Sequence, residues 1–82
     1  MRSIVFAMYD VKLGQFNSPM VFPNRAVAAR AIKDAVTPDS DFGKHPEDYQ
    51  FFVIGEFDSE SGLVQAIAPP ELFYSASDFV VS

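Results

Sequence analysis

His45 is the only histidine of the chain, and it lies in the charged run from Lys44 to Asp48. A histidine beside carboxylates can act as a general base, but that chemistry needs a substrate pocket and a reaction partner. A protein metal site needs three or four converging ligands. The sequence shows neither constellation, so we predict no catalytic residue, no metal site and no cofactor. The run is interpreted as a structured turn in which Asp or Glu side chains accept backbone hydrogen bonds.

A second group of candidates is acidic. Glu56 and Asp58 lie two residues apart, on one face of a predicted strand, and Glu60 and Asp10 are further candidates for the same group. Carboxylate oxygens of this kind suit magnesium or calcium. The spacing matches no dedicated calcium loop, however, and charges at a strand end also keep that strand from pairing with other chains. We therefore interpret these residues as solvated charges.

Three of the six basic residues, Arg25, Arg30 and Lys33, fall within one predicted helix. At 100° per residue they lie on the helix face opposite the apolar stripe that contains Ala28 and Ile32. A net charge of −5 argues against indiscriminate binding to nucleic acid, because Lys and Arg supply nearly all non-specific affinity for phosphates. The three bases are the candidate nucleic-acid-binding residues; the alternative is an ordinary solvated helix face.

The elements that must position these residues follow from local patterns. Alternating apolar and β-branched residues predict strands over residues 3–9, 15–22, 50–57 and 63–68, with the second strand broken or bulged near Pro19 and the fourth stopped by Pro69-Pro70. Asn24 is a good N-cap for an alanine-rich helix over residues 25–36. The order strand, strand, helix, strand, strand predicts an α+β fold, with one helix covering a mainly antiparallel four-stranded sheet.

Length and composition limit the possibilities further. The 82 residues suffice for a single domain, which we divide into a core (residues 1–70) and an apolar tail (residues 71–82). A hydrophobic content of 49% indicates a folded chain, and no apolar run approaches the ~18 residues of a membrane span. The chain opens directly into strand-like sequence without the apolar core of a signal peptide, so we expect it to stay in the cytoplasm where it is made.

Both sides of the third predicted strand are apolar, and one helix cannot cover both. We therefore expect the uncovered side to meet the tail or a second subunit, which would add to the limited core of so small a domain. The candidate interface residues for a homo-oligomer are Phe51, Val53, Leu72, Phe73 and Phe79.

Several short motifs occur in a characteristic order along the chain. They are Tyr9-Asp10 with Lys12 close behind, Phe22-Pro23 before the helix, KHPEDY over residues 44–49, and IGEFD over residues 54–58 followed by Gly62. In this order the chain resembles the small nonstructural protein of gokushoviruses, the single-stranded DNA phages of the Microviridae, a family known as the phage open reading frame 5 protein. The resemblance covers most of the chain up to Pro70.

The resemblance implies a noncatalytic protein of phage genome replication, active in the host bacterial cytoplasm when single strands are synthesised and packaged. This role rests partly on analogy with the packaging-switch protein of other microviruses. The implied partners are single-stranded DNA, the phage replication initiator or a capsid protein. The alternative hypothesis is a dimeric protein-interaction adaptor that does not bind nucleic acid.

Overall fold

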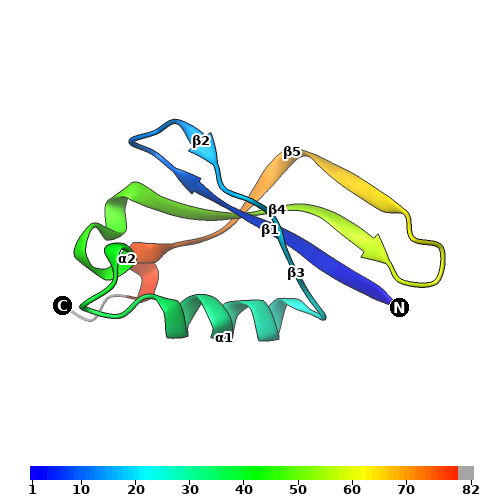
Figure 1. The fold of residues 1–82 in the computed structure, drawn as a ribbon, viewed down its shortest axis with the longest axis horizontal. Helices are drawn as coiled ribbons and strands as arrows, with labels where there is room; N and C mark the ends of the chain where they lie inside the picture. Colours follow the sequence, from blue (N-terminus) through cyan, green and yellow to red (C-terminus); the bar gives the residue numbers. More distant parts are fainter. Residues whose placement is uncertain (80–82) are drawn as a thin grey trace.

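In the computed structural model, which describes residues 1–79, a curled antiparallel sheet lies over one long helix (Figure 1). The elements are β1 (Arg2–Asp10), β2 (Gln15–Phe16), β3 (Met20–Phe22), α1 (Arg25–Ala35), α2 (Asp41–Lys44), the 3-10 helix η1 (Pro46–Asp48), β4 (Tyr49–Asp58), β5 (Val64–Ser75) and the 3-10 helix η2 (Ala76–Phe79). The predicted α+β class is confirmed, and the second predicted strand is divided into β2 and β3 around Pro19. The last three residues of the predicted tail, 80–82, lie outside the described residues.

The sheet has the strand order β2-β1-β4-β5, and β3 also pairs with β1. All pairs are antiparallel. One irregularity separates Val5, which pairs with Gly55, from Phe6, which pairs with Val53, so Ile54 is an extra residue in β4. A Cβ atom on Gly55 would lie 2.8 Å from the carbonyl oxygen of Gln65, so the close approach of β4 and β5 requires glycine at this position.

The expectation that Pro69-Pro70 ends the last strand is wrong, because β5 continues to Ser75. The two prolines fall between Ala66, which pairs with Gly55, and Glu71, which pairs with Val53. β5 is an edge strand of the sheet, where a residue without a backbone N–H need not break the pairing. Residues 71–75, which we expected to start a separate tail, therefore extend the sheet.

Helix α1 forms where local signals predict it. The Asn24 side chain accepts a hydrogen bond from the backbone N–H of Val27 at 2.9 Å, which caps the helix N-terminus. Ala28 and Ile32 are buried against the sheet, in two hydrophobic clusters that also contain Phe6 and Phe51. The apolar stripe of the helix thus packs on the sheet, and its polar stripe faces solvent.

The segment between α1 and β4 forms two short helices, α2 and η1. The Ser40 side chain accepts a hydrogen bond from the backbone N–H of Gly43 at 3.1 Å and caps the short helix α2. Phe42 packs on the core, with its ring 4.9 Å from that of Tyr49, and so anchors this segment. Gly43 lies so close to the chain before it that an added Cβ atom would overlap the carbonyl oxygen of Thr37.

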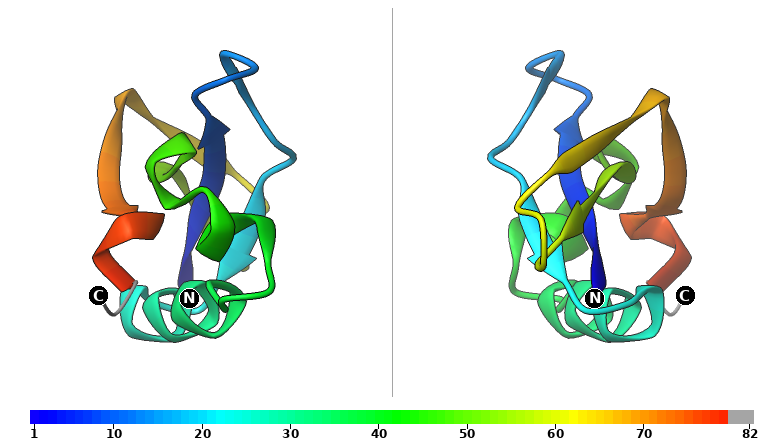
Figure 2. Two further views of the ribbon diagram at one scale, coloured as in Figure 1. Left: turned by 90° about the vertical axis from the view of Figure 1, so that its left-hand side faces the viewer. Right: turned by 90° about the vertical axis from the view of Figure 1, so that its right-hand side faces the viewer.

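The two sides of the sheet differ in what covers them. α1 lies along one side, whereas the other side shows strands and turns (Figure 2). We call the side away from α1 the outer face. By strand alternation and cross-strand pairing, its positions are Ser3, Val5, Ala7, Tyr9, Phe16, Val21, Gln50, Phe52, Gly55, Phe57, Val64, Ala66, Leu72 and Ser75. None of these positions carries a charged residue.

Candidate nucleic-acid interface

Arg25, Arg30 and Lys33 lie exposed on α1, as the helical periodicity predicts. Their environments nevertheless differ. Arg25 is in the first turn of α1, and its Nη1 atom lies 3.4 Å from Oε1 of Glu71 in β5. Its guanidinium group also lies over the ring of Phe73, 5.6 Å from the ring centroid. The neighbouring carboxylate and ring both contact this guanidinium group at the sheet edge, so its charge is partly offset.

Arg30 and Lys33 remain as the solvent-facing bases of the helix. Within residues 1–79, neither has a carboxylate within ion-pair distance. Lys33 is in the last turn of α1, where a positive charge interacts favourably with the helix dipole. Asp34 follows one turn after Arg30 and partly offsets its field, although the two groups form no ion pair. The basic surface therefore consists of two free charges rather than three.

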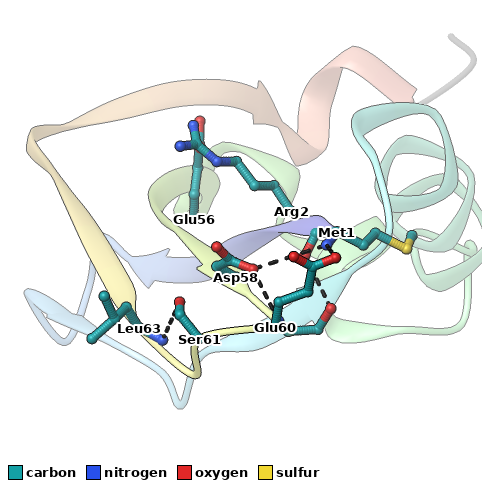
Figure 3. Close-up of polar contacts among 8 residues, drawn as sticks. Met1, Arg2, Glu56, Asp58, Glu60, Ser61 and Leu63 are labelled. Carbon is teal, nitrogen blue, oxygen red and sulfur yellow. Dashed lines mark hydrogen bonds and ion pairs between the residues drawn. The ribbon is translucent and has the colours of Figure 1, made fainter.

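The acidic residues at the far end of the sheet are neutralised by basic groups of the chain (Figure 3). Arg2 lies 3.3 Å from Glu56, and the amino-terminal ammonium group lies 3.9 Å from Asp58 and 3.8 Å from Glu60. Asp10 does not join this group, because Arg2 pairs with Asp58 at one end of β1 while Asp10 is at the other end. The arrangement fits the interpretation as charges at a strand end better than a divalent-cation site.

Asp58 is held in its charged form by this environment. The backbone N–H of Glu60 donates to Oδ1 of Asp58 at 2.9 Å. This hydrogen bond is the main cause that lowers the pKa of Asp58 below its usual value, and the amino-terminal charge and Ser61 lower the pKa further.

His45, Glu47 and Asp48 converge, contrary to expectation. Their ligand atoms lie within 4.8 Å of one another, because η1 turns the chain at Pro46. The expectation that these carboxylates accept backbone hydrogen bonds is not met among the described residues: η1 has no side-chain cap, and Ser40 caps the neighbouring helix α2 instead. His45 and Glu47 are exposed to solvent and Asp48 is half-buried. The cluster supplies the minimum number of metal ligands, in a setting open to water.

A cleft of about 530 Å³ lies between α1 and the residues that connect β2 to β3. Its lining is mainly apolar, with Met8, Ile32 and Phe51 among the contributing residues. Asn17 and Ser18 are the polar residues that line it. None of the described residues that line the cleft is titratable, and the His45 cluster lies outside it.

The five residues predicted to form an interface divide into three groups. Phe51 and Val53 are 4% and 0% exposed, so the expectation that they face a partner is wrong: they pack beneath α1 within one chain. Phe73 and Phe79 are partly buried against the same core. Leu72 is 52% exposed, pairs with Phe52 and belongs to the outer face.

Sequence reasoning missed an aromatic cluster on the outer face. The ring of Phe16 lies 4.9 Å from that of Tyr9 and 5.5 Å from that of Phe52, measured between centroids, and both contacts are edge to face. Phe16 remains about half exposed. The alternation of side chains along residues 3–9 could have predicted the exposed position of Tyr9, since it places Tyr9 on the opposite side from the inward-facing Phe6 and Met8.

The described residues thus form a small α+β domain with two free basic charges on one side and an uncharged, largely apolar sheet face on the other. None of its helices, within residues 1–79, combines the length and the apolarity needed to cross a membrane. The chain belongs to the Phage ORF5 protein family, whose family model matches residues 3–79. It is therefore a bacteriophage protein. No curated protein and no solved structure matches the chain.

Proposed function

We propose that this protein is a noncatalytic, nonstructural component of phage genome replication. In this proposal it acts in the host bacterial cytoplasm, during the synthesis and packaging of viral single strands, and binds the single strand through Arg30 and Lys33. Membership of the phage family supports a phage role. The link to single-stranded genomes is supported only by the resemblance of the short motifs, such as KHPEDY and IGEFD, to the small nonstructural protein of gokushoviruses. The observation that carries the proposed DNA contact is the solvent-facing position of both bases on α1, free of ion pairs within residues 1–79.

The charges predict binding that is weak and sensitive to salt. Two phosphate contacts release few counterions, and the net charge of −5 opposes the approach of DNA. Effective binding therefore needs a second attachment, either to another copy of the protein or to the phage replication complex. The role as a noncatalytic protein is supported by the apolar lining of the cleft and by the separation of the His45 cluster from it.

The test is a titration with single-stranded and double-stranded oligonucleotides at low and moderate salt. We expect salt-labile binding of the single strand that is abolished by Arg30→Glu combined with Lys33→Glu. Lys12→Glu combined with Lys44→Glu is the matched control, because it makes the same change in net charge at exposed positions away from α1. Absence of binding at low salt, or equal loss of binding in the two double variants, would refute direct DNA contact through α1.

A second candidate function is a protein-interaction adaptor that does not contact DNA. It is favoured by the contact between Arg25 and Glu71, which leaves α1 with fewer free charges than its sequence indicates. In this case the acidic surface would bind a basic partner, such as the replication initiator or a capsid protein. A wild-type protein that ignores both oligonucleotides and binds one of these partners in a salt-dependent manner would establish it.

A further inference from the structure

The outer face of the sheet combines properties that belong to a buried surface. It lies on the side away from α1, it carries no charged residue, and Phe16, Val21 and Leu72 on it are each about half exposed. We propose that two copies of this protein associate through their outer faces, sheet against sheet. This proposal concerns a different surface from the DNA contact on α1 and does not depend on it.

The distribution of charge selects a second copy as the occupant. Each chain carries a net charge of −5, so two copies repel each other at long range, and a contact surface without charge adds neither close like-charge pairs nor buried charges to that cost. The charged residues of β4 and β5, Glu56, Asp58 and Glu71, all lie outside the outer face. The cores of protein interfaces are likewise depleted of charged residues. A nucleic acid would be a poor occupant, since the face offers no Lys or Arg to its phosphates.

The size of the exposed surface points the same way. The chain has a solvent-accessible surface of 5361 Å², whereas a typical folded monomer of this mass exposes about 4,900 Å². Its radius of gyration is 13.1 Å, compared with about 12 Å for a domain of this length. Four strands about 4.8 Å apart and up to about 33 Å long present a face on the order of 600 Å². Standard interfaces bury about 600 to 1,000 Å² per partner, so a face of this size lies at the lower end of the range for a stable dimer.

The face is also prepared for association. The edge-to-face contacts among Tyr9, Phe16 and Phe52 fix these rings in the single chain, so little side-chain freedom is left to lose on binding. At the centre of the face Val5 and Ala7 are already buried within the single chain, so Phe16, Val21 and Leu72 are the residues that present apolar surface to a partner. A twofold arrangement would place the aromatic cluster of one copy against the apolar side chains of the other, since the same surface serves on both sides.

The test compares two leucines with opposite predicted roles. Leu72 is on the outer face and Leu63 is in the turn before β5, and they are 52% and 70% exposed. Sedimentation velocity of the full chain over a micromolar to millimolar range should show a dimer for the wild type. Leu72→Lys should raise the dimer dissociation constant at least tenfold, because each dimer contains two copies of the change, whereas Leu63→Lys should leave it unchanged. Circular dichroism checks that both variants fold.

Val21→Lys gives an independent answer from β3 if Leu72→Lys fails to fold, and it should also dissociate the dimer. A wild type that stays monomeric over the whole range overturns the proposal, as does a Leu63→Lys variant that dissociates as readily as the outer-face variants. At moderate salt, which screens the added negative charge, Arg30→Glu combined with Lys33→Glu should leave dimerisation intact, so a failure of the DNA proposal and a failure of this one give different results.

Discussion

Replacing Glu71 by Gln should strengthen the binding of single-stranded DNA and make it more sensitive to salt. The reason is that Glu71 holds the Arg25 guanidinium group at 3.4 Å, at the edge of the row of bases on α1. The neutral amide of Gln keeps the size and polarity of the side chain but removes its charge. Arg25 then becomes available to a phosphate, next to Arg30 and Lys33.

The magnitude follows from the number of bases. With Arg30 and Lys33 as contacts, the slope of log K against log salt should be about −1.4, at about 0.7 counterions per phosphate of a single strand. A third contact from Arg25 changes the slope to about −2.1. The gain in affinity should be at most about fivefold, because the exposed ion pair that competes for Arg25 is worth at most about 1 kcal/mol. The cost to the folded state is small, since an exposed ion pair contributes at most about 1 kcal/mol to the free energy of unfolding.

Fluorescence anisotropy of a labelled oligonucleotide, repeated over a series of salt concentrations, measures both quantities. Glu56→Gln is the matched control, because it makes the same change in net charge and frees Arg2, which lies 3.3 Å from Glu56 and is not part of α1. The slope of this control should stay at the wild-type value. An unchanged slope in Glu71→Gln, or an equal change in both variants, would refute the assignment of the DNA contact to α1.

Three further predictions concern the scaffold. Gly43→Ala should lower the free energy of unfolding in urea by about 1 to 3 kcal/mol, because the added Cβ atom overlaps the carbonyl oxygen of Thr37; an unchanged midpoint would contradict this packing. His45→Ala should change the free energy of unfolding by no more than about 1 kcal/mol, since His45 is exposed. Elemental analysis of the purified protein should find no bound transition metal. Stoichiometric zinc in the wild type that is absent from the variant would contradict this prediction. Folding lowers the pKa of Asp58, so the charged carboxylate stabilises the protein above the usual pKa of 3.8, and this contribution disappears as pH falls through the folded pKa. The difference in free energy of unfolding between wild type and Asp58→Asn should therefore vanish at the acid end of a pH series. A difference that stays constant with pH would contradict the lowered pKa.

The parts of the fold that could be predicted depend on local signals. Asn24 as the N-cap, the alanine-rich stripe and the strand alternation each act over a few residues, and all three appear in the structure. The length of β5 could not be predicted in the same way, because a proline pair stops a central strand but is tolerated in an edge strand. The position of a strand within the sheet depends on pairing partners far away in the chain.

The candidate site shows the same division. Helical periodicity correctly placed Arg25, Arg30 and Lys33 on the exposed side of α1. It could not reveal that Glu71 compensates Arg25, because this contact joins the start of α1 to a strand near the end of the chain. Alternation likewise separated the two sides of β4, but only the packing of α1 decided that Phe51 faces the core.

The prolines of β5 also limit how the sheet can grow. Pro69 and Pro70 lie in an edge strand, and neither has a backbone N–H that could bond to an added strand. On the opposite side of the sheet, β2 and β3 are only 2 and 3 residues long. Sheets that lengthen sideways, molecule after molecule, form fibrils, and both interrupted and very short outer strands oppose this process. A rise in concentration should therefore favour a closed assembly of defined size over an open-ended polymer.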